Sequence, residues 1–239
     1  MKTYNEMTFL EHILELRSRL LKIFFSIMFF SIIGYLNSNL IISFLLYPVS
    51  DPHINLQVLK ITSIFSTKLM VAVFFGLIIS FPILLYQLLS FIMPAFDNKL
   101  TVFKIIMFIC ISLLLFIIGL FFGYYILIPF SVTFFKSISI PLLESISLNY
   151  TLENYLIYLI WILIISSLVY QLPILILFIV KMGIIDLKWL KSNRRYVIVI
   201  FFILSALFTP PDPLSQLMVA LPLIMLYEIS IIIIRISSK

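Results

Sequence analysis

Six long runs of apolar residues dominate the chain, and they decide which solvent it can fold in. The runs cover residues 21–42, 69–93, 102–129, 155–180, 196–208 and 214–234. Of the 239 residues, 63% are hydrophobic and 11% are charged, whereas an average soluble domain is about 25% charged. A soluble fold cannot hide this much apolar surface. The sequence therefore predicts an all-α polytopic membrane bundle of six transmembrane helices, forming one membrane domain over residues 1–239.

Helices are expected for all six runs because a lipid environment offers no partner to unpaired backbone groups. The runs do not alternate polar and apolar residues, as the strands of a membrane barrel would. The fifth run, residues 196–208, is short, since 13 helical residues rise only about 20 Å against a hydrocarbon core of about 30 Å. We expect it to lie in a thinned bilayer or to be shielded by protein. The segments 37–68 and 130–154 are expected to be long outer loops.

Lysine and arginine residues predict the orientation of the bundle. If the N-terminus lies inside, 13 of the 16 basic residues fall on the inner side, as the positive-inside rule requires. Both termini are then expected on the cytoplasmic or matrix side. The net charge of +6 is explained by this topology, and we expect no nucleic-acid partner.

The segment before the first apolar run contains a pattern of charged residues at helical spacing. Glu11, Glu15 and Arg19 are each four residues apart, so that on a helix they share one face. One interpretation is an amphipathic interfacial anchor with a single ion pair. The other is a carboxylate displayed at the inner edge of the membrane, where it binds a cationic ligand. Spacing alone leaves both open.

Four polar or acidic residues fall within or beside the last three runs. Gln171 lies beside Pro173 and needs a partner in the bundle interior or in a wet cavity. Asp212 is placed to cap the sixth helix, with Pro213 at its first position. Gln216 follows one turn later, and Glu228 lies near the inner end of the same helix. Polar groups at such depths are either interhelical hydrogen-bond partners or functional sites.

Enzymatic chemistry has little support in the sequence. The two histidines, His12 and His53, lie outside the apolar runs, and Cys110 is the single cysteine. Neither a phosphate-binding loop nor a nucleophile elbow is present in the sequence. We expect no enzymatic activity, no metal ion and no cofactor.

Four motifs, in order along the chain, resemble those of the TatC family. They are His12-x-x-Glu15-Leu16-Arg17-x-Arg19-Leu20, Tyr86-Gln87-x-x-x-Phe91-Ile92-x-Pro94-Ala95, Thr209-Pro210-Pro211-Asp212-x-x-Ser215-Gln216 and Leu226-Tyr227-Glu228. The resemblance covers essentially the whole chain. No single motif is sufficient, but the ordered set is highly specific.

The resemblance implies a receptor subunit of a twin-arginine protein translocase. Such a subunit recognises signal peptides with paired arginines, and folded proteins are exported by the proton-motive force without nucleotide hydrolysis. The implied partners are twin-arginine precursors, single-span TatA/TatB-like subunits, membrane lipid and further copies of the chain in a homo-oligomer. The implied signal-peptide site comprises His12, Glu15, Leu16, Arg17, Arg19, Phe91, Pro94 and Asp97. The implied partner-facing or intramembrane polar residues are Gln171, Asp212, Gln216 and Glu228.

Two positions depart from the family pattern. The family usually has Glu in the first inner loop, where this chain has Leu100, so that the loop's acidic group is either missing or moved to Asp97. The fourth span often carries Glu where this chain has Gln171. Both departures point to a narrow set of cargo proteins or to a relaxed signal.

Composition bears on the source of the chain and not on its mechanism. The sequence has 24 Phe, 5 Gly and few Ala, a bias typical of an AT-rich genome. With the motifs, it predicts a mitochondrial inner-membrane protein, the alternative being a bacterial plasma-membrane protein. Two other functions stay open, namely a secondary transporter and a structural subunit of a respiratory complex. The lack of an internal repeat in the sequence counts against the transporter.

Overall fold

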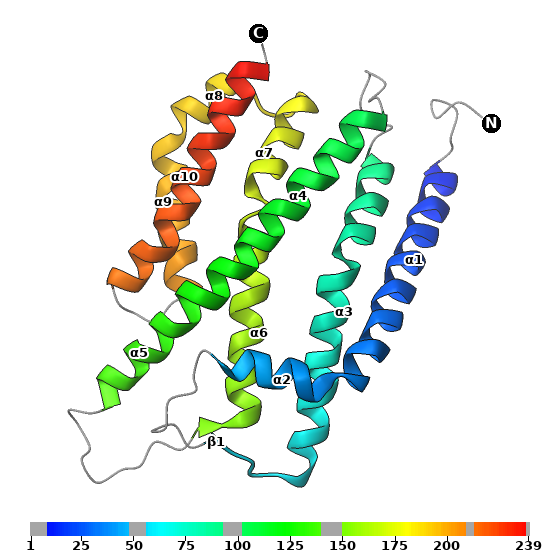
Figure 1. The fold of residues 1–239 in the computed structure, drawn as a ribbon. Coiled ribbons are helices and arrows are strands. Elements are labelled where there is room, and N and C mark those ends of the chain that lie inside the picture. The colour runs from blue at the N-terminus through cyan, green and yellow to red at the C-terminus, as the bar shows by residue number, and fades with distance from the viewer. Residues whose placement is uncertain (1–8, 48–55, 93–101, 140–149, 209–212, 238–239) are drawn as a thin grey trace. The chain divides into compact units, whose positions relative to one another are not determined.

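The structure is a computed structural model that describes residues 9–47, 56–92, 102–139, 150–208 and 213–237. Apart from two strands of two residues each, the regular elements in these residues are helices (Figure 1). In chain order they are α1 (Phe9–Leu36), α2 (Ser38–Leu46), β1 (Leu56–Gln57), α3 (Ile61–Ile92), α4 (Val102–Phe122), the π-helical turn η4 (Gly123–Leu127), α5 (Ile128–Ser139), β2 (Tyr150–Thr151), α6 (Leu152–Val169), α7 (Leu172–Lys181), α8 (Leu187–Ser192), α9 (Arg194–Phe208) and α10 (Pro213–Ser237).

The chain divides into two compact units. Unit 1 comprises Met1–Leu45 and Val58–Leu113, and unit 2 comprises Leu46–Gln57 and Leu114–Lys239. Helix α4 continues from one unit into the other.

Unit 1 is built on α1 and α3, which run side by side in opposite directions (Figure 1). Small residues allow the two backbones to approach closely, as in many membrane helix pairs. A Cβ atom added to Gly76 would lie 2.7 Å from the Ile27 carbonyl oxygen, and one added to Gly34 would lie 3.0 Å from the Ala72 carbonyl oxygen. This packing brings the first turns of α1 next to the last turns of α3.

A serine pair adds a polar contact to the same helix pair. The Ser26 hydroxyl donates to the Ser80 hydroxyl at 3.0 Å. Ser80 itself is buried, so the contact satisfies a polar group away from lipid.

Unit 2 contains a core between α7, α8, α9 and α10. Its buried members include Phe201, Leu223 and Tyr227. The Tyr227 hydroxyl donates to the Leu190 carbonyl oxygen at 2.8 Å and so ties α10 to the short helix α8. In the same unit β1 and β2 pair in parallel, with Leu56 opposite Tyr150.

The helix formed by α4, η4 and α5 is continuous and carries one wide turn at Gly123–Leu127. Close contact with α6 begins just before this turn, because a Cβ atom on Gly119 would lie 2.7 Å from Ser167 Cα. The Ser166 hydroxyl donates to the Gly119 carbonyl oxygen at 2.5 Å. A carbonyl on α4 therefore has a partner from α6 as well as its own helical bonds.

Five helical segments of the described residues are long and apolar enough to cross a membrane. They are Leu10–Leu36, Ile61–Ile92, Ile106–Phe134, Leu152–Lys181 and Gln216–Ile236. The prediction of an all-helical, multi-span membrane fold is confirmed. The fifth predicted run, 196–208, corresponds to α9, whose 15 residues rise about 22 Å. It is a short helix, as the sequence indicated.

The ends of the helices differ from the predicted runs. Helix α1 begins at Phe9, twelve residues before its apolar run, and α2 and the first turns of α3 occupy part of the predicted loop 37–68. Similarly, α5 extends to Ser139 within the predicted loop 130–154. Hydrophobicity marks the part of a helix that crosses lipid, whereas backbone hydrogen bonds continue beyond it.

The predicted fourth run, 155–180, is interrupted near its middle. Helix α6 ends at Val169 and α7 begins at Leu172, with Gln171 as its N-cap. Pro173 stands in the first turn of α7, where its missing N–H costs no helical hydrogen bond. The proline thus starts a new helix rather than kinking a continuous one.

Candidate functional site

The candidate site lies in unit 1, where the first turns of α1 face the last turns of α3 (Figure 1). Because the two helices are antiparallel, side chains near residue 15 of α1 reach those near residues 87–91 of α3. The charged segment before the first apolar run is therefore not an isolated anchor, since it is packed against a second helix.

A carboxylate and a guanidinium form the centre of this site. Arg19 donates to Glu15 Oε1 from Nε at 2.9 Å and from Nη2 at 2.5 Å. The predicted pairing at four-residue spacing is thus confirmed. The side chains of Glu15 and Arg19 are only 18% and 16% exposed, so solvent screens the pair less than it would a surface pair.

The third guanidinium nitrogen connects the pair to α3. Arg19 Nη1 donates to Gln87 Oε1 at 3.2 Å. Gln87 stands in one of the family-like motifs, but it is not among the site residues that the resemblance implies. Its position on α3 relative to Arg19 depends on how the two helices pack, and no spacing within either segment encodes that contact.

An aromatic pair covers the other side of Glu15. The rings of His12 and Phe91 stack with centroids 4.6 Å apart and an interplanar angle of 18°. His12 Nδ1 lies 3.9 Å from Glu15 Oε2. This oxygen has almost no accessible surface and accepts no hydrogen bond within the described part of the chain. Glu15 is thus enclosed by Arg19 on one oxygen and by the His12–Phe91 stack near the other.

Leu16 and Arg17 face away from this cluster. At about 100° per residue, Arg17 lies roughly opposite Glu15 on α1. Both residues line an open, largely apolar hollow on the surface of α1 together with Ile13, Leu20, Leu21 and Phe24. The structure therefore brings four of the predicted site residues together, namely His12, Glu15, Arg19 and Phe91. Pro94, Asp97 and the departing position Leu100 lie outside the described residues.

The predicted polar residues of unit 2 have distinct surroundings. Gln171 is 7% exposed, which agrees with the expectation that it faces the interior. Gln216 Nε2 donates to the Phe202 carbonyl oxygen at 2.8 Å and links α10 to α9. Glu228 Oε2 lies 3.1 Å from Arg194 Nη2. Asp212, predicted to cap α10, lies outside the described residues, whereas the predicted start of that helix at Pro213 is confirmed.

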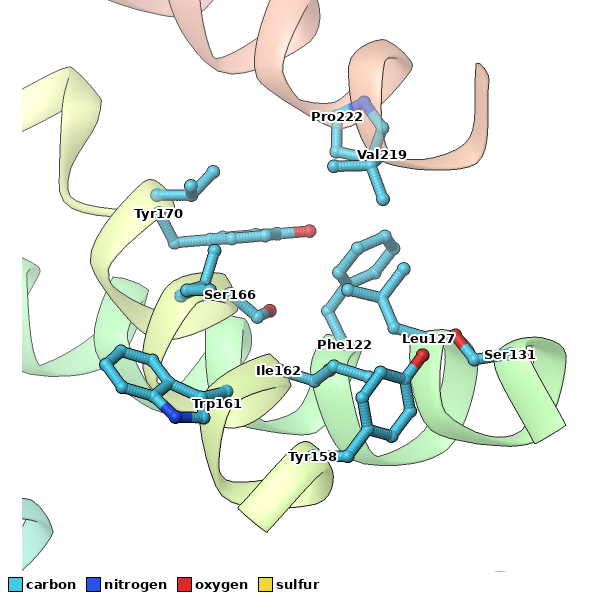
Figure 2. A pocket seen from close by; sticks show the side chains of 12 residues that line it. Phe122, Leu127, Ser131, Tyr158, Trp161, Ile162, Ser166, Tyr170, Val219 and Pro222 are labelled. Atoms are coloured by element: carbon cyan, nitrogen blue, oxygen red, sulfur yellow. The ribbon is translucent and has the colours of Figure 1, made fainter. Parts of the chain in front are cut away.

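Unit 2 also contains a hollow of about 190 Å³ between α10 and the segment from α4 to α6. Figure 2 shows aromatic and aliphatic side chains around it, with Val219 and Pro222 of α10 on one side. The Tyr158 hydroxyl lies next to the Ser131 side chain. The lining is mainly apolar, so the hollow suits hydrocarbon or an apolar side chain rather than a polar solute.

The chemistry available at the candidate site is the binding of a cation by a carboxylate. A carboxylate accepts about four hydrogen bonds, and a guanidinium pairs with it in a planar fork. In the described ranges, no group of three or more His, Cys, Asp and Glu residues is arranged to hold a metal ion. Within the cluster of His12, Glu15, Arg19, Gln87 and Phe91, the Glu15 carboxylate is thus the group able to accept hydrogen bonds from a guanidinium or ammonium group.

Comparison with known proteins agrees with the sequence motifs. The model of the family described as "Sec-independent protein translocase protein (TatC)" matches residues 11–222. The protein TatCy of Bacillus subtilis (strain 168) is 35% identical over 234 residues, which cover 96% of this chain and 89% of that protein. TatC of Rickettsia prowazekii (strain Madrid E) is 35% identical over 241 residues, or 98% of this chain and 93% of that protein. A TatC-like protein of Reclinomonas americana is 33% identical over 237 residues, covering 96% and 88%.

Solved structures show the same likeness in three dimensions. A crystal structure of the twin-arginine translocase receptor TatC in DDM superposes with a TM-score of 0.81 and 29% identity, covering 93% of this chain and 99% of that one. A second crystal structure of that receptor gives a TM-score of 0.80 and 28% identity, with coverage of 96% and 100%. Because the family model, full-length relatives and structures of the same fold all agree, the chain belongs to the TatC family of Sec-independent protein translocase proteins.

Proposed function

We propose that this protein is the receptor subunit of a twin-arginine translocase, and that the cluster around Glu15 binds the signal peptide. The family membership supports the role, and the enclosed Glu15 carboxylate supports the site. The protein then acts in transport and not as an enzyme. The proton-motive force supplies the energy for the passage of folded cargo.

At the site, the Glu15 carboxylate binds a guanidinium group of the signal peptide through a planar pair of hydrogen bonds. The stacked His12 and Phe91 rings provide a flat apolar surface on which the aliphatic part of an arginine side chain packs. Arg19 donates a hydrogen bond to the same carboxylate. Leu16 and Arg17 are proposed to contact the signal peptide from another face of α1, where they line the apolar hollow. Pro94 and Asp97, which follow α3 in the sequence, are proposed to belong to the same site.

The proposed topology has six spans in one membrane domain, with both termini on the inner side. Helix α9 is the short fifth span, and its 15 residues require a thinned bilayer or a protein neighbour. The arrangement of basic residues supports the orientation. In unit 2, helix α8 and the last turns of α10 lie at the same end of the unit (Figure 1), and α9 begins two residues after α8 ends. These parts of the chain carry Lys188, Lys191, Arg194, Arg195 and Arg235, as expected for an inner face.

Single-span TatA/TatB-like subunits are proposed to bind along α9 and α10. Because α9 is short, a neighbouring partner helix can cover the surface of α9 that would otherwise face lipid. The apolar side chains of that partner helix fit the hollow beside Val219 and Pro222. Gln171, Asp212, Gln216 and Glu228 are the polar groups proposed to serve this interface or the interior. The working complex then contains several copies of the chain.

We propose the mitochondrial inner membrane as its location, with a bacterial plasma membrane as the alternative. The similarity to the Reclinomonas americana protein and the Phe-rich, Ala-poor composition support the first. The bacterial relatives support the second.

Crosslinking tests the proposed role directly. A twin-arginine precursor with a photo-crosslinker beside its arginine pair is added to membranes containing the wild type, Glu15→Gln or Glu11→Gln. We expect a crosslink to the wild type and to Glu11→Gln, which alters a charge one turn away, and its loss in Glu15→Gln. Equal crosslinking of Glu15→Gln and the wild type, at equal membrane levels, overturns the proposed site.

A further inference from the structure

The Glu15 carboxylate already holds a guanidinium, and that guanidinium belongs to this chain. Arg19 uses two nitrogens on Oε1 of Glu15 and a third on Oε1 of Gln87. The contact has the same chemistry as the one that the proposed function assigns to the signal peptide. An incoming arginine therefore meets an occupied carboxylate.

The remaining oxygen offers no open approach. Glu15 Oε2 has almost no accessible surface, and it lies under His12, which is stacked on Phe91. A planar fork requires both carboxylate oxygens or two lone pairs of one oxygen. A ligand guanidinium can form it only after Arg19 moves from Oε1.

We propose that Arg19 competes with the signal peptide for the Glu15 carboxylate. Through this competition, Arg19 determines how many arginine side chains a signal peptide needs in order to bind. This inference rests on the proposed function of the Glu15 site. Exchanging one arginine for another on the same carboxylate changes the free energy little, because like bonds replace like bonds. A single arginine thus gains little by displacing Arg19, and net affinity must come from a second arginine and from apolar contacts.

Gln87 makes this exchange feasible. When Arg19 leaves Glu15, its guanidinium keeps the hydrogen bond to the Gln87 amide oxygen, which has a second lone pair to offer. Without that acceptor the displaced charge would stay in a partly buried site without a partner, which is costly. Gln87 is a positioning residue for Arg19, and it acts on the ligand only through Arg19.

Peptide binding to the full chain in lipid nanodiscs tests this proposal. Three fluorescent peptides share one apolar segment and carry Arg-Arg, a single Arg or no basic residue. The protein variants are Arg19→Gln, which keeps a polar side chain but removes the guanidinium, and Lys22→Gln. Lys22 is exposed on α1 one turn further on, so its variant controls for the loss of one positive charge.

We expect Arg19→Gln to bind the Arg-Arg and single-Arg peptides about tenfold more tightly than the wild type, because a hydrogen bond to a charged group is no longer displaced. Lys22→Gln should change both by less than about threefold. The peptide without basic residues should be unaffected by either change. Unchanged or weaker binding by Arg19→Gln, with an unaltered melting temperature, overturns the proposal.

Gln87→Leu gives a second, independent test. Alone, it should weaken Arg-Arg binding by about threefold, because Arg19 then has only Glu15 as a partner. In the Arg19→Gln variant, adding Gln87→Leu should not change peptide affinity further. If Gln87→Leu weakens binding equally in the wild type and in Arg19→Gln, the positioning role is contradicted. If the wild type binds no arginine peptide at all, the proposed function itself fails, and this inference fails with it.

Discussion

Arg194 at the start of α9 and Glu228 on α10 form an ion pair with 3.1 Å between Nη2 and Oε2. The two side chains are 44% and 35% exposed. The neighbouring Tyr227 is buried and bonded to Leu190. Consecutive residues of α10 thus form a buried hydrogen bond and an exposed ion pair, and the two should respond very differently to substitution.

Breaking the exposed pair should change stability little. Glu228→Gln is expected to lower the free energy of unfolding by less than about 1 kcal/mol, because exposed pairs contribute little. Thermal melting in detergent measures this. If Glu228 instead serves a partner subunit, the variant should lose co-purifying single-span protein at unchanged melting temperature. A large drop in melting temperature would show that the pair is a structural tie.

Removing the buried hydroxyl should have a clear effect. Tyr227→Phe leaves the Leu190 carbonyl oxygen without its 2.8 Å donor, which costs about 1–3 kcal/mol when the acceptor stays buried. Tyr196→Phe is the matched control, since Tyr196 is exposed and its hydroxyl accepts a hydrogen bond from the neighbouring Arg195 at 3.0 Å. Equal melting temperatures for the two variants would contradict the assigned role of Tyr227.

The helix pair of unit 1 should be sensitive to volume at Gly76. A methyl group there meets the Ile27 carbonyl oxygen at 2.7 Å, so Gly76→Ala must move backbone and should cost about 1–3 kcal/mol. Gly34→Ala, with its nearest contacts at 3.0 Å, should cost less. Signal-peptide affinity should also fall more in Gly76→Ala than in Gly34→Ala, since the site requires α1 and α3 in register.

The bond between α9 and α10 can be tested through Gln216. Gln216→Glu replaces the donor to the Phe202 carbonyl oxygen with an acceptor, and two acceptors repel. Gln216→Leu removes the bond without repulsion. We expect Gln216→Glu to be less stable than Gln216→Leu, and both to bind the single-span partner less than the wild type. The reverse order of melting temperatures would show that Gln216 does not donate this bond.

The apolar runs predicted the membrane fold because lipid leaves so few choices to a backbone. They located the helices within membrane depth but not their ends. Phe9 and Ser139 are helical although hydrophobicity does not extend to them. The break at Gln171 depends on where Pro173 falls in a helical turn, which a hydropathy profile does not register.

The candidate site could be predicted only in part, for a similar reason. The pairing of Glu15 with Arg19 is local, so a spacing of four residues was enough to find it. The stack of His12 on Phe91 and the bond from Arg19 to Gln87 join residues that are 79 and 68 positions apart in the chain. They depend on the antiparallel packing of α1 and α3. The same packing places Leu16 and Arg17 on another face, although the motif lists them beside Glu15.

The most direct test of the account is a double-mutant cycle between Glu15 and the arginine pair of a signal peptide. Affinities are measured for the wild type and Glu15→Gln, each with Arg-Arg and Gln-Gln peptides, in nanodiscs. A direct carboxylate–guanidinium contact predicts a coupling free energy of about 1–3 kcal/mol. Additive effects, with a coupling free energy near zero, would show that the arginines bind elsewhere and would contradict the account.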